Sequence, residues 1–294
     1  MTIRWGVSPI AWSNDDMPEL GGSTPLEDIF RDIREVGFEG VELGGRFPKE
    51  PEALRAMLGG LDLIGGWYSG SLLVQDADAE IADLQPHLAL LKAMGSSVFV
   101  FAETSNAVHG NRAVPLSGTP RLQVGDWKTF GDRMTLVADY IASEGLKFAY
   151  HHHLGTVVET AADMDAFIAA TGPSVGFTLD TGHAALGGVN SLAVIRDHPE
   201  RVAHAHCKDV RWETFTKVKK GGASFLDGVL AGMFTVPGDG GIDYAEVMAA
   251  LKRMDYSGWI VIEAEQDPAL ADPRTYADLG LKTLKSRAAE AGLV

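Results

Sequence analysis

The stretch LKFAYHHHLGT at residues 146–156, together with VGFTLDTGHA at residues 175–184, decides the fold class of this chain. Each segment begins as a short apolar run typical of a buried strand, and then ends in histidine or aspartate beside glycine. The same unit, an apolar run followed by a longer stretch with helical periodicity, recurs along the chain. Eight strands are expected, at Ile3–Val7, Glu39–Leu43, Leu61–Trp67, Ser97–Phe101, Leu146–His151, Val175–Leu179, Val202–His206 and Trp259–Ile262.

Three of the stretches between these strands carry clear helix signals. Thr24 is expected to be the N-cap of the first helix, with Pro25 in the first helical position and Gly37 directly after the last turn. Helices are also expected at Asp126–Ser143 and Asp243–Met254, because apolar residues recur there with helical spacing.

Continuous alternation of strands and helices predicts parallel strands joined by right-handed crossovers. Eight such units in 294 residues indicate an α/β protein, a closed (β/α)8 TIM barrel that forms one domain over residues 1–294. An open, doubly wound sheet is the alternative. The turn VSPI at residues 7–10 counts against it, because it lacks the glycine-rich phosphate-binding pattern of that fold.

The overall charge excludes several classes of partner. There are 25 Lys and Arg against 40 Asp and Glu, a formal charge of −15, so nucleic acid and anionic membrane surfaces are not expected as partners. The single cysteine, Cys207, rules out an intramolecular disulfide and a cysteine-rich zinc site. No apolar run approaches the roughly 18 residues of a membrane span. We therefore expect a cytoplasmic protein, with a homo-oligomer left open.

Two connections are unusually long for a compact domain. They cover about 103–125 and 210–242, each directly after a predicted strand. Since connections after the strands of such a barrel lie over its C-terminal face, these segments are candidate lids or binding loops. The alternative is that both are ordinary surface excursions.

Ionisable residues gather where the predicted strands end, which is the face that carries the chemistry of such barrels. Five strands contribute them: Glu42; His151, His152 and His153; Asp180 and His183; His204, His206 and Lys208; Glu263 and Glu265. A desolvated cluster of carboxylates and imidazoles is costly unless a charge neutralises it, and a divalent cation does so directly. Histidine with aspartate or glutamate is a ligand set for Mn²⁺, Co²⁺, Fe²⁺ or Zn²⁺.

Position along each strand narrows the ligand choice to the first ionisable group after each apolar run. This choice gives four candidate ligands: His151, Asp180, His206 and Glu263. The next residues are candidates for proton transfer or for supporting the ligands: His153, His183, Lys208 and Glu265. Each residue alone also has a plain structural explanation, as a loop end, a helix cap, a core histidine or half of an ion pair.

Several segments resemble one known family along nearly the whole chain. They are WGVSPIAWSNDD (5–16), GWYS (66–69), YHHHLGT (150–156), LDTGHA (179–184), HCKDVR (206–211), VPGDG (236–240) and GWIVIEAEQDP (258–268). The chain resembles the xylose-isomerase-like barrel superfamily and, within it, the family of inosose dehydratases. The histidine triplet before Gly-Thr and the sequence EAEQDP are the parts that resemble the dehydratases specifically.

The resemblance implies a barrel, a bound divalent metal such as Mn²⁺ or Co²⁺, and dehydration of 2-keto-myo-inositol to a trihydroxycyclohexane-1,2-dione. It also raises glutathione as a cofactor. Many isomerases and epimerases of the superfamily have glutamate where His151 stands in this sequence. The loss of one carboxylate counts against a two-base epimerase, although a sugar or inosose isomerase or epimerase, or a lyase of another keto-sugar, stays open.

Two further alternatives remain at this point. An apurinic-site nuclease of the same superfamily would need a basic groove, which the charge of −15 does not favour. A non-catalytic sugar-binding protein would bind metal without turning over any keto-polyol.

The expected partner is a small cyclic keto-polyol, and the expected roles follow from elimination chemistry. Glu263 or Glu265 would act as the base, and His153 or Lys208 as the acid. Four further residues are expected to bind substrate: Trp12, Glu42, Trp67 and His183. Trp12 and Trp67 would pack on the apolar face of the ring, or be ordinary core aromatics instead.

Overall fold

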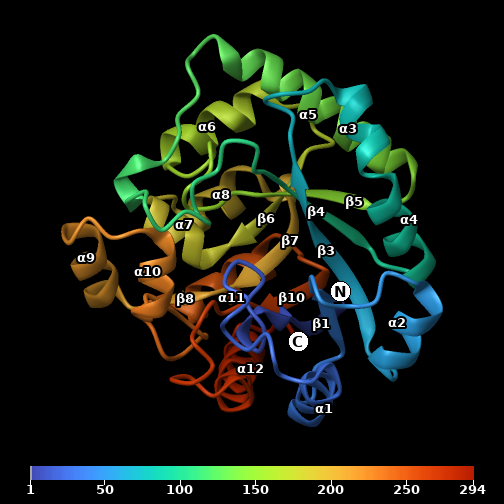
Figure 1. Cartoon of the computed structure of the whole chain (residues 1–294), viewed down its shortest axis with the longest axis vertical. Helices are drawn as coiled ribbons and strands as arrows, with labels where there is room; N and C mark the ends of the chain where they lie inside the picture. Colours follow the sequence, from blue (N-terminus) through green and yellow to red (C-terminus); the bar gives the residue numbers. More distant parts are fainter. Residues whose placement is uncertain (1) are drawn as a thin grey trace.

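Eight parallel strands close into a barrel in the computed structural model, which describes residues 2–294. Around the barrel the order is β1-β10-β7-β6-β5-β4-β3-β2 (Figure 1). These strands are β1 (Ile3–Val7), β2 (Gly40–Leu43), β3 (Asp62–Gly70), β4 (Val98–Glu103), β5 (Lys147–His151), β6 (Gly176–Asp180), β7 (Val202–Cys207) and β10 (Gly258–Ile262). The predicted (β/α)8 barrel is confirmed, and the open doubly wound sheet is excluded.

Helices surround this barrel on the outside (Figure 1). They are α1 (Leu26–Val36), α2 (Pro51–Leu58), α3 (Ala77–Asp83), α4 (Gln85–Met94), α5 (Asp126–Ser143), α6 (Ala161–Ala170), α7 (Thr181–Gly187), α8 (Ser191–Asp197), α9 (Trp212–Lys220), α10 (Phe225–Leu230), α11 (Tyr244–Arg253) and α12 (Pro273–Glu290). Among residues 2–294, no helix is both long and apolar enough to cross a membrane.

The predicted helix ends agree with the structure except at two helices: α11 is one residue shorter at each end than the predicted Asp243–Met254, and the start of α1 differs. Gly37 ends α1 with a φ of 95°, and α5 has the predicted bounds. The N-cap of α1 is Pro25 and not Thr24, because Pro25 has an extended ψ of 136° and its carbonyl accepts from the amides of Asp28 and Ile29. The Thr24 carbonyl instead accepts from the Arg46 guanidinium, 2.9 Å away.

Apolar side chains fill both sides of the strands, as expected when helices cover a parallel sheet. All six residues of β4 are buried. Phe99 and Phe101 belong to the large outer core with the helices, whereas Val98 and Val100 join a small separate cluster with residues such as Ile64. Gly6 must lack a side chain, because a Cβ there would lie 2.2 Å from Ile64 Cδ1.

The two long connections meet over the C-terminal ends of the strands. The first contains a short 3-10 helix at Leu116–Gly118, and the second contains α9, α10 and an antiparallel pair of β8 (Asp209–Val210) with β9 (Phe234–Thr235). The backbone amide of Leu116 donates to the carbonyl of Ala223 over 2.9 Å. The two segments therefore support each other, and a role as lids stays a prediction.

Candidate metal centre

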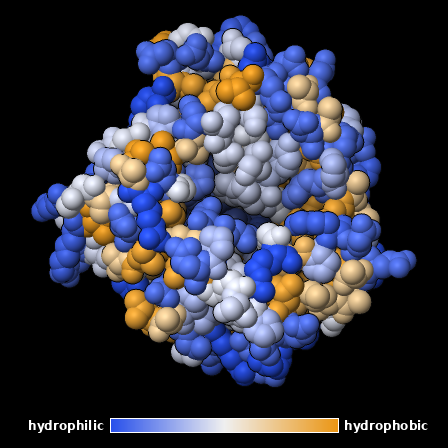
Figure 2. Space-filling model, viewed as in Figure 1, coloured by the Kyte–Doolittle hydropathy of each residue, from blue (hydrophilic) through white to orange (hydrophobic). Residues whose placement is uncertain are grey.

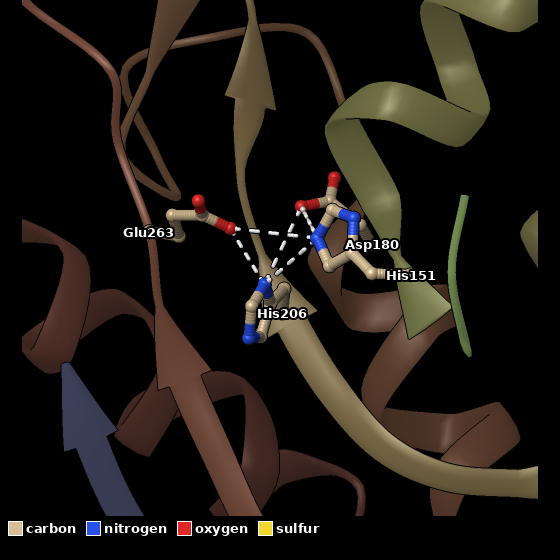
Figure 3. A group of neighbouring side chains, drawn as sticks. All are labelled: His151, Asp180, His206 and Glu263. Carbon is tan, nitrogen blue, oxygen red and sulfur yellow. Dashed lines mark hydrogen bonds and ion pairs between the residues drawn. The ribbon is translucent and has the colours of Figure 1, made fainter. Parts of the chain in front are cut away.

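Four side chains predicted as ligands converge at one point of the barrel mouth (Figure 3). His151 ends β5, Asp180 ends β6, His206 lies in β7, and Glu263 directly follows β10. His151 Nε2 lies 3.2 Å from His206 Nδ1 and 3.5 Å from Asp180 Oδ2. Glu263 Oε2 lies 2.6 Å from His206 Nδ1 and 3.9 Å from His151 Nε2. Asp180 Oδ2 lies 3.7 Å from His206 Nδ1.

These separations suit a shared divalent cation. Ligand atoms at about 2.1 Å from an ion lie roughly 3.0–3.4 Å apart in octahedral or tetrahedral coordination. Asp180 Oδ2 and Glu263 Oε2 are buried, and among residues 2–294 neither makes a hydrogen bond of regular geometry. Both oxygens face the ring nitrogens of the candidate histidine ligands. Burying a carboxylate oxygen without a hydrogen bond costs free energy. A cation bound between these two oxygens would remove that cost. The residues fit a divalent metal ion.

Hydrogen bonds fix two carboxylates near this centre, Asp180 and Glu42. Asp180 Oδ1 accepts from the amide of His183 over 2.8 Å, because Asp180 is also the N-cap of α7. Glu42 Oε1 accepts from Nε2 of His206 and from Nε2 of His204, each over 2.9 Å. Since the Nε2–H of His206 is held by Glu42, its Nδ1 is the atom presented to the centre.

Glu42 thus lies behind a candidate ligand, whereas the sequence predicted it to bind substrate. It also lines the cavity described below, so contact with substrate stays a prediction. Burial would raise the pKa of its carboxyl, but His206 and His204 outweigh burial and lower that pKa to about 2. The Glu42 carboxylate is therefore ionised at neutral pH.

A second buried cluster adjoins the first and contains the other predicted proton-transfer residues. Lys208 Nζ lies 2.8 Å from His183 Nε2, 3.1 Å from Glu265 Oε2 and 3.5 Å from Glu263 Oε1. Burial would lower the pKa of Lys208, but Glu263, Glu265 and Asp180 outweigh burial and raise that pKa. The lysine is therefore a charged donor, and His183 accepts its hydrogen bond.

His153 and Glu265 are the members of this second cluster that reach the cavity. His153 Nδ1 lies 2.7 Å from the carbonyl oxygen of Leu154, so the proton sits on Nδ1 and Nε2 carries a free lone pair. Burial lowers the pKa of His153 to about 4, although Glu265 opposes it. Burial raises the pKa of Glu265, but Lys208 and His153 outweigh it, so that this pKa is lowered overall.

Both clusters open into a cavity of roughly 340 Å³ at the end of the barrel, a small volume for a ligand site. Figure 2 shows the molecule hollowed near the middle of this face. Trp67 lines the cavity, with its ring centre 5.2 Å from that of His151. Trp12 does not, because its ring is buried in the core and its indole Nε1 donates to Asp32 over 3.3 Å. His183 lies behind the cavity wall, at the start of α7.

Sequence reasoning missed further residues of the cavity wall. Asp15 and Asp16 come from the connection after β1, Lys49 from the connection after β2, and His109 from the long connection after β4. The strand-end rule, by which ionisable residues after a strand are taken as site candidates, could have found Asp15 and Asp16, because both lie in the connection after β1. His109 had no such signal, because a loop of irregular structure has no periodicity that places a side chain.

Protons and a metal ion compete for this centre. Burial would lower the pKa of His206, but Glu42 and Glu263 outweigh burial and raise that pKa well above its ordinary value. Without metal the imidazole is therefore protonated at neutral pH, and Nδ1–H occupies the position that a cation needs. Metal binding must release this proton.

We therefore expect the dissociation constant for Mn²⁺ or Co²⁺ to rise as the pH falls, by about tenfold per pH unit while metal-free His206 is protonated. The rise should be steeper where His151 is protonated too, because burial would lower its pKa, but Asp180 and Glu263 outweigh burial and raise that pKa. Calorimetric titration of metal-free protein in buffers of different ionisation enthalpy measures both the affinity and the protons released. An affinity that does not change with pH, with no proton release, would contradict this account of His206.

Comparisons with known proteins agree with the barrel. A family model described as xylose isomerase-like TIM barrel matches residues 30–287. The rhizopine catabolism protein MocC of Rhizobium meliloti is 44% identical over 294 residues, covering 99% of this chain and 90% of that protein. The inosose dehydratase of Bacillus velezensis is 39% identical, covering 97% and 96%, and that of Geobacillus thermodenitrificans is 38% identical, covering 94% of each.

Solved structures show the same fold at low sequence identity. A xylose isomerase domain protein from Alicyclobacillus acidocaldarius matches with a TM-score of 0.69 at 18% identity, covering 99% of this chain and 100% of that one. An L-ribulose 3-epimerase matches with a TM-score of 0.68 at 16% identity, covering 99% and 96%. With the closed barrel, the buried histidine and carboxylate clusters at its C-terminal end and the family match over most of its length, the chain belongs to the xylose isomerase-like TIM barrel family.

Proposed function

We propose that this protein is a metal-dependent hydro-lyase that removes water from 2-keto-myo-inositol and yields a trihydroxycyclohexane-1,2-dione. The inosose dehydratases at 38% and 39% identity support the substrate class. The observation that carries the reaction type is the pairing of Glu265 with His153 beside the four-residue centre, because it provides one proton relay on one side of the cavity.

Removal of water from a ring ketone requires one group to take a proton and another to return it. Glu265 takes the proton from the carbon beside the ketone, the C–H electron pair forms a C=C bond, and the neighbouring C–OH bond breaks. Glu265 Oε1 lies 3.9 Å from His153 Nε2, and both groups have pKa values in the acidic range. A movement of about 1 Å or one bridging water closes this distance, and the proton then passes to His153 and on to the departing hydroxide, which leaves as water.

Other residues hold the reactants in place for this transfer. When bound at His151, Asp180, His206 and Glu263, a divalent cation supplies Lewis-acid stabilisation of the negative charge that develops on the ketone oxygen. Lys208 keeps Glu265 ionised through its 3.1 Å contact with Oε2. Trp67, a large aromatic side chain that is 36% exposed, offers an apolar face for the C–H side of the ring.

A substrate of rhizopine catabolism is the second candidate. The observation that favours it is the higher identity, 44%, to the relative named for that process. The reaction type and the roles of Glu265 and His153 would be the same, and the difference would lie in the ring substituents that the cavity accepts.

The test is an assay of purified protein, first stripped of metal and then reloaded with Mn²⁺ or Co²⁺, on 2-keto-myo-inositol. We expect the absorbance of an enolised dione to grow only after reloading, with and without added glutathione compared in parallel. The same reaction in deuterated water separates the alternatives. Uptake of deuterium without loss of water would replace the dehydratase by an isomerase or epimerase, and metal binding without either would indicate a binding protein.

A further inference from the structure

Two polar side chains at the mouth of the cavity make no hydrogen bond within the described chain. Asp16 and His109 both line the cavity, and their nearest atoms, Asp16 Oδ1 and His109 Nε2, are 3.9 Å apart, beyond hydrogen-bond distance. His109 Nδ1 is buried and has no partner among residues 2–294. Because both side chains line the cavity, the Asp16 carboxylate and His109 Nε2 are available to a ligand there, whereas His109 Nδ1 is buried.

The missing hydrogen bonds of Asp16 do not come from a poorly anchored loop, because the neighbouring Asp15 is hydrogen-bonded. Asp15 Oδ2 accepts from the amide of Gly45 over 2.8 Å and so ties the connection after β1 to the connection after β2. Asn14 Oδ1 accepts from the amides of Asp16 and Met17, each over 2.8 Å, which fixes the backbone at Asp16. The loop is therefore held by Asn14 and Asp15, and within residues 2–294 the carboxylate of Asp16 makes no hydrogen bond that holds it.

The backbone around His109 is fixed as well. The amide of Val108 donates to the carbonyl of Gly155 over 2.8 Å. Gly155 has a φ of 80°, and a Cβ there would lie 2.9 Å from the amide nitrogen of His109, so the close approach of the two loops requires glycine. The His109 ring lies with its centre 4.8 Å from that of His153. The His109 imidazole is therefore already positioned beside the proposed proton relay before a substrate binds.

We propose that Asp16 and His109 form a hydroxyl-recognition pair that selects a polyhydroxylated ring by its carbons farthest from the metal centre. The substrate class in this proposal, a cyclic polyol, is taken from the proposed function. A carboxylate accepts from two hydroxyl groups, and His109 Nε2 donates or accepts according to the ring's tautomer, so together they match neighbouring hydroxyls on a ring. The pair is distinct from the metal centre and the relay, and it acts on binding and not on the chemical step.

The experiment compares Asp16→Asn, His109→Phe and His109→Gln with the control Glu19→Gln. Glu19 lies on the same loop, is exposed, and contacts Arg112 of the opposite loop, so its variant tests loop-to-loop charge loss without touching the cavity. The readouts are kcat and KM on 2-keto-myo-inositol, metal content, thermal stability, and calorimetric binding of myo-inositol, which lacks the ketone.

We expect Asp16→Asn and His109→Phe to raise KM and weaken myo-inositol binding by about tenfold to a hundredfold, with kcat within about threefold and metal content unchanged. His109→Gln should recover part of the affinity, because its amide can still donate and accept. Changes no larger than those of Glu19→Gln, or losses in kcat and stability with KM unchanged, would overturn the recognition pair.

The calorimetric binding of myo-inositol distinguishes a failure of the recognition pair from a failure of the proposed function. If the wild type binds myo-inositol but does not dehydrate the ketone, and Asp16→Asn loses that binding, the dehydratase fails and the recognition pair stands. If the metal-loaded wild type binds neither compound, the pair does not recognise cyclic polyols and the proposal is overturned.

Discussion

Replacing Asp180 with asparagine is expected to abolish both stoichiometric metal binding and turnover. Asp180 Oδ2 lies 3.5 Å from His151 Nε2 and 3.7 Å from His206 Nδ1, with no hydrogen-bond partner of its own among residues 2–294. The substitution keeps the oxygen that caps α7, since asparagine caps helices as well as aspartate does, but removes the charge that a cation needs. The loss should exceed the roughly 10- to 100-fold that removing a partner of a metal ligand costs.

The charges around the centre explain why the effect should be large. Glu42, Asp180, Glu263 and Glu265 are four buried carboxylates. Among residues 2–294, Lys208 is the one buried lysine, and without metal His206 adds a second positive charge, so the carboxylates stay in excess. Uncompensated buried charge is costly, and a divalent cation offsets most of the excess. The neutral asparagine side chain would reduce that excess and remove a ligand at the same time, so affinity falls for both reasons.

The measurement is elemental analysis of the purified variant beside the dehydration assay. Asp76→Asn is the matched control, because Asp76 caps α3 through the amide of Ala79 and lines no part of the cavity. Both variants should melt close to the wild type when the metal is removed from all three. Wild-type metal content in Asp180→Asn would show that the assignment of this ligand is wrong, and wild-type metal content in His206→Ala as well would show that the whole centre is wrongly assigned.

Much of the fold could be read from the sequence because its strands are short apolar runs at regular intervals. The predicted strand Ile3–Val7 has the bounds of β1, and the predicted Val202–His206 is one residue shorter than β7. The strand-end rule also placed His151, Asp180, His206 and Glu263 in one cluster, because parallel strands in a closed barrel end on one rim. Metal binding by that cluster stays a prediction.

What could not be predicted depends on contacts outside the periodic elements. β5 ends at His151, so His153 reaches the cavity through the turn after the strand and not through strand alternation. Trp12 was expected to pack on the apolar face of the ring or to be a core aromatic. It is buried directly after the 3-10 helix at Pro9–Ala11, with its indole turned toward Asp32. Asp16 and His109 meet across two loops, a pairing that no local pattern encodes.

Replacing Glu265 with glutamine is expected to lower kcat by about 10²- to 10⁴-fold while metal content stays at the wild-type level. Glutamine keeps the size of the side chain and can still accept from Lys208, but it cannot take a proton from carbon. Glu265 Oε2 is 3.1 Å from Lys208 Nζ, and Oε1 is 3.9 Å from His153 Nε2, so the isosteric change leaves both neighbours in place. This result would separate the proton relay from the metal centre.

Glu159→Gln is the control for loss of a buried carboxylate in the same region. Glu159 Oε2 accepts from the amide of Gly155 and the hydroxyl of Thr119, and it does not line the cavity. Its variant should lose stability and keep kcat. For Glu265→Gln, deuterium exchange at the carbon beside the ketone should fall together with dehydration, because both need the same base. Exchange at the wild-type rate without dehydration would instead make Glu265 the acid of the elimination, and a parallel loss of metal would move it into the ligand set.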